Sequence, residues 1–511
     1  MTTAAAAAPA PSSGIAARFL LFITAYFVLQ ALLRLLAVDS LGLDDAEMVV
    51  ITQDLAIGYG SQPPLYNWLQ LGAFRLFGFG APAIAILHFV LLWAVYVLVF
   101  LSARIVLADA LRAAVVALGL FAIPQIGWEA LHSHTHTLLS LTLAAATLYA
   151  MLRVIEIGSW GRYLVLALCF ALGALAKYSY IPFAAALLVA GATLAETRRR
   201  VLSLRMAAAL VVALVLVAPH LYWVWTHLAE TLSRTSKFKI DDDAGLVLAW
   251  GRGLLAMVVG VAGYVGLSLA VFAAASFLPV GRGTAPTAVK PGLPGGRAFV
   301  LRTLAVALGL VLVAVLATRA TEVKERWLQP VLFVLPLALM IMVEPRLNAA
   351  RERLLALVMA GIGVVLLAAL AVAYLAPGLY GAPLRANAPF AALAADIRAL
   401  GFARGTILAE SHYIAGNLKL HLPDVTVAEP EYGLWPLAEG GRTAPVLLVW
   451  SGKRDRPPQA LRELYERLCG ARGLDPEATP TRFREPYRHA PGERYELAVV
   501  TVPDCPSGGT P

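Results

Sequence analysis

The chain has 511 residues, of which 59% are hydrophobic and only 14% are charged, and its mean hydropathy is +0.74. About a quarter of the residues of a soluble globular protein are charged, so this composition excludes that class and predicts a polytopic α-helical membrane protein. The formal net charge of +9 does not indicate a nucleic-acid partner, because most basic residues stand in short loops between apolar runs, where they set topology.

The N-terminal residues 1–16 favour a disordered cytoplasmic tail, since they carry no basic segment of the kind that begins a signal peptide. The apolar run that follows is long enough to remain in the membrane and has no clear cleavage site. The chain contains no Asn-x-Ser/Thr sequon and is rich in Ala and Leu, which favours a bacterial protein.

Eleven apolar runs have the length expected of membrane-spanning helices. They lie near 17–38, 81–103, 110–126, 137–155, 161–176, 179–195, 204–224, 248–278, 303–318, 327–344 and 354–376. The two runs that flank Lys177 are also compatible with one long kinked helix.

The positions of Lys and Arg predict the orientation of these helices. If the N-terminus is cytoplasmic, the inner loops hold about twice as many basic residues as the outer loops, as the positive-inside rule requires. Eleven helices then place the C-terminus outside the plasma (inner) membrane.

Two regions outside the spans have a distinct pattern. The first outer loop, about 39–80, is amphipathic and rich in Trp and Tyr, which predicts two helices that lie on the membrane surface. From 377 to 511, short apolar strands alternate with amphipathic helices, which predicts a small extracytoplasmic α/β domain beside a transmembrane domain over 17–376. Cys469 and Cys505 lie in that domain and can pair in an oxidising compartment.

An acidic cluster follows the first predicted span. Asp44 and Asp45 stand at the outer interface, and Glu47 lies three residues after Asp44, so that Asp44 and Glu47 share a helix face. One interpretation is a solvated helix terminus in which Asp44 or Asp45 caps the surface helix. The other is a general base for an acceptor hydroxyl.

The order of several motifs resembles a known superfamily. The acidic pair, the surface helix and QPPLYNWL are similar to the first outer loop of the GT-C glycosyltransferases that use polyprenyl-phosphate sugars, in the group of protein mannosyltransferases, aminoarabinose transferases and lipopolysaccharide galacturonosyltransferases. LGALAKYSYIPFAAALL, APHLYWVWTH and TEVKERWLQPVLFVLPLAL resemble later segments of that family in the same order. The resemblance covers most of 17–376.

The resemblance implies a GT-C bundle and a donor whose lipid tail lies between helices. Its phosphate needs positive partners, for which Lys177, Lys324 and Arg326 are candidates, and the resemblance adds Gln62 and Tyr66 as donor-binding residues. A snorkelling lysine is the alternative for Lys177, and a helix-end anchor is the alternative for Arg326. No metal is required if these charges neutralise the phosphate.

The resemblance also implies a single displacement with inversion at the anomeric carbon. Asp44 or Asp45 would deprotonate or orient the acceptor, with a slight preference for Asp45. The acceptor is expected to be an envelope molecule: a glycolipid such as lipopolysaccharide, a polysaccharide or a protein. The sequence specifies neither the sugar nor the length of the polyprenyl chain.

The chain departs from the family at WEALHSHTHTLLSL, where relatives often have an aspartate at the position of His136. On a helix, His132 and His136 would share a face, and with Glu129 they are weak candidates for a divalent metal. Interfacial polar histidines and contact with the acceptor are the alternatives. His220 in APHLYW is a further candidate for the substrate cavity.

Two other functions are compatible with the composition. A transporter or flippase predicts ionisable residues at mid-membrane depth. The predicted spans contain almost none, and the main one, Arg34, lies near the outer end of its span. A non-enzymatic envelope scaffold would tolerate loss of Asp44, Asp45 and Lys177. The mixed-charge stretch 237–243 favours a solvated loop, and ESHYIAGNLKLHLP favours a strand–helix junction with structural polar contacts.

Overall fold

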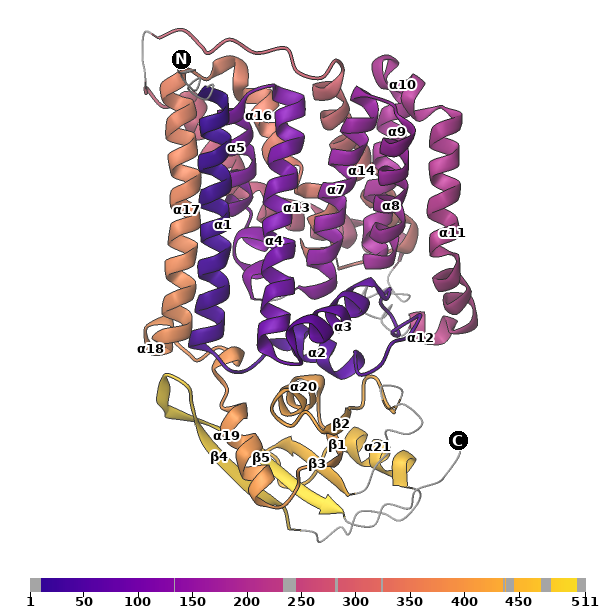
Figure 1. Ribbon diagram of the computed structural model, residues 1–511, viewed down its shortest axis with the longest axis vertical. Coiled ribbons are helices and arrows are strands. Elements are labelled where there is room, and N and C mark those ends of the chain that lie inside the picture. Colours follow the sequence, from indigo (N-terminus) through magenta and orange to yellow (C-terminus); the bar gives the residue numbers. More distant parts are fainter. Residues whose placement is uncertain are drawn as a thin grey trace, which may run out of the picture. The chain divides into compact units, whose positions relative to one another are not determined.

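The structure, a computed structural model, describes residues 11–132, 134–232, 245–280, 284–322, 325–434, 437, 445–469 and 479–502 (Figure 1). Lys324, Cys505 and the stretch 237–243 lie outside these residues, so the expectations for them stay predictions. The first helix already begins at Pro11, so the expected tail over 1–16 is wrong for its last six residues, which extend the apolar helix.

The chain divides into two compact units. The bundle unit comprises Met1–Val28, Gly60–Leu65 and Val90–Leu366, and the α/β unit comprises Leu29–Tyr59, Tyr66–Phe89 and Leu367–Pro511. The acidic part of the first outer loop therefore belongs to the same unit as the C-terminal strands. The expected domain boundary at 376/377 stays a prediction.

The helices before the C-terminal region follow the expected apolar runs closely. They are α1 (Pro11–Ala37), α2 (Leu43–Ile51), α3 (Leu65–Phe77), α4 (Ala81–Leu107), α5 (Ala110–Leu118), η1 (Gly119–Ala122), α6 (Pro124–Gly127), η2 (Glu129–Leu131), α7 (Thr135–Glu156), α8 (Trp160–Ala176), η3 (Tyr178–Tyr180), α9 (Ile181–Thr193), α10 (Ala195–Val201), α11 (Leu204–Thr226), α12 (Leu228–Leu232), α13 (Leu246–Phe277), α14 (Gly296–Thr318), η5 (Glu325–Trp327), α15 (Gln329–Leu332), α16 (Leu335–Val343), η6 (Glu344–Arg346) and α17 (Ala349–Leu375).

Eight of the described helical segments are long and apolar enough to cross a membrane, and two further pairs are bent, so that up to ten spans result if each pair counts as one. The remaining expected span is α8, which has 17 residues. Each of the eleven expected runs therefore coincides with helix. The chain breaks at Lys177, whose backbone is extended, so the alternative of one long kinked helix is wrong.

One of the two bent pairs has a local cause. The pair Ala110–Ala122 and Pro124–Leu131 turns by 84°, and Pro124 starts the second part because its ring fits the first turn of a helix but not the interior. Gly127 is required beside this bend, since a β-carbon there would overlap the carbonyl oxygen of Phe121.

A buried ionic cluster connects the segment 284–296 to the helices of the bundle unit. Arg112 is 1% exposed and bonds Glu344 at 3.0 Å, Glu352 at 2.9 Å and the carbonyl oxygen of Thr287 at 3.1 Å. Arg297 also bonds Glu344, at 2.6 Å. Each buried charge thus has partners of opposite sign, which offsets its desolvation.

The α/β unit contains a five-stranded sheet in the order β2-β1-β3-β5-β4. The C-terminal elements are α18 (Pro377–Tyr380), η7 (Arg385–Asn387), α19 (Phe390–Ala399), β1 (Gly405–Ala409), α20 (His412–His421), β2 (Val425–Ala428), β3 (Val446–Ser451), α21 (Gln459–Cys469), β4 (Thr481–Tyr487) and β5 (Ala490–Val502). β2, β1 and β3 are parallel, whereas β5 pairs antiparallel with both β3 and β4.

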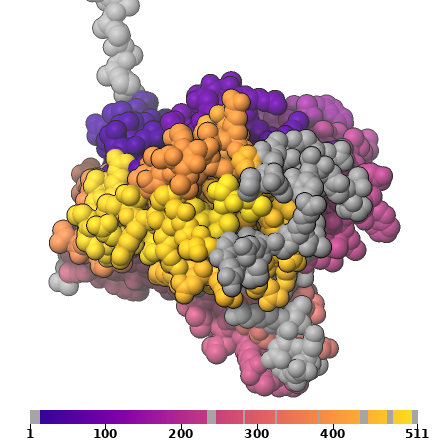
Figure 2. Space-filling view, turned by 90° about the horizontal axis from the view of Figure 1, so that it is seen from below, coloured from indigo at the N-terminus to yellow at the C-terminus, as the bar shows by residue number. Residues whose placement is uncertain are grey.

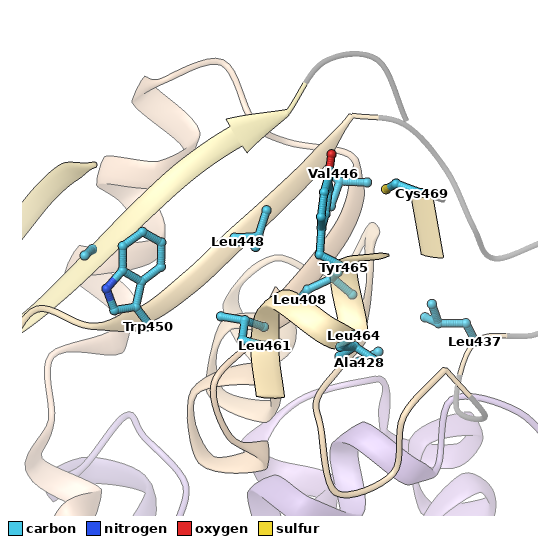
Figure 3. Close-up of a cluster of buried hydrophobic side chains, with 11 residues drawn as sticks. Leu408, Ala428, Leu437, Val446, Leu448, Trp450, Leu461, Leu464, Tyr465 and Cys469 are labelled. Atoms are coloured by element: carbon cyan, nitrogen blue, oxygen red, sulfur yellow. The ribbon is translucent and has the colours of Figure 1, made fainter. Parts of the chain in front are cut away.

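One apolar core lies between this sheet and α21. Leu408, Leu448 and Trp450 of the strands pack with Leu461 and Leu464 of the helix (Figure 3). Figure 2 shows the residues of this part, coloured orange and yellow, next to one another on the face that is seen from below. The strands expected in GTILAE, VTVAEP, APVLLVWSG and YELAVVTV are β1, β2, β3 and β5, and the amphipathic helices expected in FAALAADIRALG and PPQALRELYERLCG are α19 and α21, so these expectations are confirmed. β4 was not expected, because its alternating charged residues are largely exposed at the sheet edge.

The first outer loop packs directly on the C-terminal elements inside the α/β unit. α2 lies against α20, and a β-carbon at Gly416 of α20 would overlap the backbone of Ala46 in α2. Asn417 binds the backbone of Leu41 twice: its Oδ1 accepts from the amide at 2.7 Å and its Nδ2 donates to the carbonyl at 3.3 Å. The expected strand–helix junction with structural polar contacts is therefore confirmed.

The Gln53 side chain fastens the other end of α2. Its Nε2 donates to the carbonyl oxygen of Val427 at 2.8 Å, and its Oε1 accepts from the Val427 amide at 3.1 Å. This amide thus pairs with the outer edge of β2 as a neighbouring strand would. The sequence held no signal for this contact, since the two residues are 374 positions apart.

We expect Gly416→Ala to destabilise the protein, because the added methyl group must push α2 away from α20. Overpacking of this kind costs about 1–3 kcal/mol, which would lower the temperature of unfolding in detergent by a few degrees. Gly309→Ala is the matched control, since position 309 is also helical and has open space around it. Equal unfolding temperatures for both variants would contradict the close packing of α2 on α20.

Candidate functional site

The acidic cluster lies on α2, which begins at Leu43. Its N-cap is Gly42, and no side chain caps the helix, so the expectation that Asp44 or Asp45 acts as a cap is wrong. Both aspartates instead occupy the first turn, where negative charge is favoured by the helix dipole. Asp44 is partly exposed, whereas Asp45 is 1% exposed.

Asp45 forms a buried ion pair with Arg34. The guanidinium Nη2 donates to Oδ2 of Asp45, and Arg34 is 8% exposed. Arg34 stands in the last turn of α1, inside an expected span, and the cost of burying its charge demands a partner of opposite charge. The other atoms of the pair, Arg34 Nη1 and Asp45 Oδ1, are buried and make no hydrogen bond within the described chain.

Tyr66 lies beside this pair. It occupies the first turn of α3, directly after the Pro-Pro turn, and is fully buried. Burial raises the pKa of the Tyr66 phenol well above its ordinary value, and the negative charges of Asp45 and Asp44 raise it further against the effect of Arg34. The phenol is therefore protonated at neutral pH. Gln62, the other expected donor-binding residue of this loop, is partly exposed.

Glu47 faces the C-terminal part of the α/β unit. Its Oε1 accepts a hydrogen bond from the phenol of Tyr432, and it is 9% exposed. Glu47 thus helps to hold α2 on the C-terminal elements. Arg34, Asp44, Asp45, Glu47 and Tyr66 are hereafter called the acidic group.

A second constellation, the lysine group, belongs to the bundle unit. Lys177 has extended backbone between α8 and η3, and its Nζ donates to the hydroxyl of Thr137 on α7. His136 places Nδ1 3.3 Å from the carbonyl oxygen of Ala176, which fixes the ring against the end of α8. Because the helix ends before it, Lys177 is not a residue of a regular span.

The lysine group continues onto α11. The phenol of Tyr178 lies 3.1 Å from Nε2 of His220, and the two rings are stacked with centroids 6.2 Å apart. His220 is 2% exposed and also stacks on Trp223. His136 contacts Ala176 and His220 contacts Tyr178, and these two residues flank Lys177 in the chain. The structure therefore brings His136, Lys177 and His220 into one part of the bundle unit.

The expected metal geometry is wrong. α7 begins at Thr135, and His132 lies before it as the C-cap of η2, so His132 and His136 do not share a helix face. Glu129 instead lies 3.7 Å from Nε2 of His134. Among the residues that the structure describes, no group of three His, Cys, Asp or Glu side chains is arranged to hold a metal ion.

His134 has an unusual backbone conformation. Its φ of 79° and ψ of 55° lie in the left-handed region, which is uncommon for residues other than glycine. Such residues often lie at functional sites, where the surrounding structure holds them. Arg326, the remaining described candidate for the donor phosphate, is half-buried in η5.

Comparisons with known proteins agree with the fold and with the order of the motifs. The dolichyl-phosphate-mannose-protein mannosyltransferase family matches residues 61–223. The chain is 34% identical over 441 residues to the lipopolysaccharide core galacturonosyltransferase RgtA of Rhizobium johnstonii, a match that covers 85% of this chain and 86% of RgtA. It is 32% identical over 495 residues to RgtB of the same organism, over 94% and 96% of the two chains.

The fold is similar to that of ArnT from Cupriavidus metallidurans, solved with bound undecaprenyl phosphate. The TM-score is 0.56 at 16% sequence identity, with 94% of this chain and 97% of ArnT covered. At this identity the likeness concerns the fold alone, and it confirms the expected GT-C architecture.

We expect Arg34→Met to destabilise the protein by about 3–5 kcal/mol, because it leaves the Asp45 carboxylate buried without its counter-charge. The double variant Arg34→Met/Asp45→Asn should recover much of this loss, since no unpaired charge remains. Thermal unfolding of the purified proteins in one detergent measures the difference. A double variant less stable than Arg34→Met would contradict the ion pair.

Proposed function

The chain belongs to the family of membrane glycosyltransferases that includes the lipopolysaccharide core galacturonosyltransferases, and from this membership we propose that it transfers a galacturonosyl residue from a polyprenyl-phosphate donor to the core of lipopolysaccharide. The observation that carries the proposal is a match of 34% identity over 85% of the chain. Because these relatives are glycosyltransferases, we no longer favour the transporter and scaffold alternatives.

The proposed location is the bacterial inner membrane, with the N-terminus in the cytoplasm and the C-terminal strands outside. The excess of Lys and Arg in the alternate loops supports this orientation. It would place the acidic group on the outer side, where a donor that diffuses in the bilayer meets an acceptor that is extracytoplasmic.

We propose that Asp44 acts as the general base. The sequence slightly favoured Asp45, but the Asp45 carboxylate is buried and its Oδ2 is already bound by the Arg34 guanidinium, which makes it less accessible to an acceptor hydroxyl. Asp44 is partly exposed on the same turn of α2. Asp45 would then have a positioning role: its ion pair fixes the first turn of the helix that presents Asp44.

In the proposed step, Asp44 takes the proton of an acceptor hydroxyl while the oxygen of that hydroxyl attacks the anomeric carbon of the donor sugar. The new glycosidic bond forms as the bond from that carbon to the phosphate oxygen breaks, and polyprenyl phosphate leaves with the electron pair. Inversion follows from a single displacement. Negative charge that develops on the phosphate requires a cation, for which we propose Lys177, a lysine anchored by Thr137.

We propose that no metal is needed for this step. The leaving group is a phosphate monoester dianion once released, and one or two fixed cations are sufficient to stabilise it as it forms. Treatment with a chelator should therefore leave the transfer rate unchanged.

The experiment uses the purified full chain in lipid, radiolabelled polyprenyl-phosphate galacturonic acid and lipopolysaccharide core. Asp44→Asn and Lys177→Met should each lower kcat at least a hundredfold, because general-base and charge stabilisation each contribute about 10²–10⁴-fold. Asp45→Asn should lower kcat less than Asp44→Asn but lower stability more.

The matched control is Asp396→Asn, a partly exposed aspartate on α19. Its rate should equal that of the wild type. Transfer that survives in Asp44→Asn but is abolished in folded Asp45→Asn would assign the base to Asp45. Absence of transfer by the wild type from this donor, with transfer from another polyprenyl-phosphate sugar, would overturn the galacturonosyl assignment.

A further inference from the structure

A cavity of about 240 Å³ lies beside the C-terminal end of α2, within the α/β unit. This volume is below the about 300–1,000 Å³ of pockets for drug-sized ligands, so it suits one small group such as a single sugar. α2, α3, the residues that follow each of them, and α20 supply its walls. The lining residues are Val49, Thr52, Gln53, Leu71, Phe74, Arg75, Phe79 and Lys419.

Two cations and no carboxylate line this cavity. Arg75 is exposed, and Lys419 is half-buried at the end of α20. None of the eight lining residues, all of which the structure describes, is acidic. An anionic ligand is therefore favoured here and a cationic one is not.

The Lys419 ammonium is held in place. It donates to the carbonyl oxygens of Pro423 at 2.8 Å and Val425 at 2.6 Å, and Nζ lies 5.8 Å from the ring centre of Phe79. An ammonium has three N–H donors, so one remains after these two bonds. Burial lowers the pKa of Lys419 despite the opposing effects of Asp424 and Asp54, and an anion in the cavity would compensate that desolvation.

The remaining walls suit a sugar. Phe74 and Phe79 have ring centroids 4.8 Å apart and offer apolar surface to the C–H face of a pyranose. The Thr52 hydroxyl already accepts from Nδ2 of Asn67 at 2.7 Å and can still donate. The cavity thus combines cations, aromatic rings and a hydroxyl, which is the combination expected for an acidic sugar.

The place of the cavity on α2 separates it from the reacting centre. Thr52 is eight positions after Asp44, which corresponds to about 12 Å along the helix. A carboxylate on the transferred sugar lies closer than this to its own anomeric carbon. A group bound in the cavity while Asp44 contacts the acceptor hydroxyl is therefore too far away to be the carboxylate of the transferred sugar, whereas a neighbouring sugar of the acceptor can reach it.

We propose that this cavity is an acceptor subsite that binds the carboxylate or phosphate of an acidic sugar adjacent to the one that is glycosylated, through Arg75 and Lys419. The proposal rests on the proposed function, because it presumes a saccharide acceptor near Asp44. It makes the cavity a determinant of acceptor specificity and not a part of the donor site.

The experiment measures transfer by the full chain in phosphatidylcholine bilayers. The acceptors are native lipopolysaccharide and the same material with carboxyl groups reduced and phosphates removed. The variants are Arg75→Gln and Lys419→Met, with Arg462→Gln on the exposed face of α21 as the control. Arg75→Gln keeps the test valid if Lys419→Met misfolds, since the Arg75 side chain is exposed.

We expect each variant to raise the KM for native acceptor about tenfold, because it loses one charge-assisted hydrogen bond to the acceptor. The kcat and the KM for the donor should stay within twofold of the wild type. With the neutralised acceptor, wild type and variants should have the same raised KM. Unchanged KM in Arg75→Gln, or an equal effect with both acceptors, would overturn the subsite. An effect that arises only when phosphatidylglycerol is added would assign the cavity to a phospholipid and overturn it too.

Failure of the proposed function can be distinguished from failure of the subsite by a direct binding measurement. If the wild type transfers nothing to lipopolysaccharide, binding of the two lipopolysaccharide preparations to the protein is measured directly. A preference for the native form that Arg75→Gln abolishes would support the anion subsite without the transfer reaction. Equal binding of both forms would overturn it.

Discussion

The buried ion pair between Arg34 and Asp45 is the interaction on which the acidic group depends. A guanidinium near the end of an apolar helix is unfavourable without a partner, and an aspartate that is 1% exposed is unfavourable without a cation. Each therefore fixes the other, and with it the exit of α1 and the first turn of α2. Asp44 acquires a defined position as a consequence, since it precedes Asp45 in that turn.

The C-terminal elements hold the rest of the loop. Asn417 binds the backbone just before α2, and Gly416 permits the close approach of the middle of α2 to α20. Tyr432 donates a hydrogen bond to Glu47, and Gln53, just after α2, bonds the backbone of β2. Segments separated by more than 370 residues therefore act as one unit. The C-terminal region contacts the candidate catalytic helix along its length, and it has a well-packed core of its own around Trp450.

The apolar runs were sufficient to predict nearly all of the helices, because a span must satisfy its own backbone and so leaves a strong local pattern. The C-terminal strands were equally visible, except for β4, whose exposed charged residues lack the apolar alternation. The contacts of Gln53, Asn417 and Tyr432 were not predictable, since single polar residues give no sign of a partner hundreds of positions away. Arg34 did carry a signal: a charge inside a span implies a counter-charge, and the acidic pair was the nearest one. The expected histidine pair failed because helix α7 begins three residues after His132, and helix ends are the least certain part of a periodic pattern.

The pairing of Gln53 with β2 has a consequence for association between molecules. β2 is one of the two outer strands of the sheet, and an uncovered outer strand offers its amide and carbonyl groups to a strand of another chain. At Val427 both groups are already bound by the side chain of Gln53, which lies two residues after the end of α2. The contact that anchors the acidic helix therefore also blocks the sheet edge, so loss of that side chain would loosen the helix and open a route to aggregation at the same time.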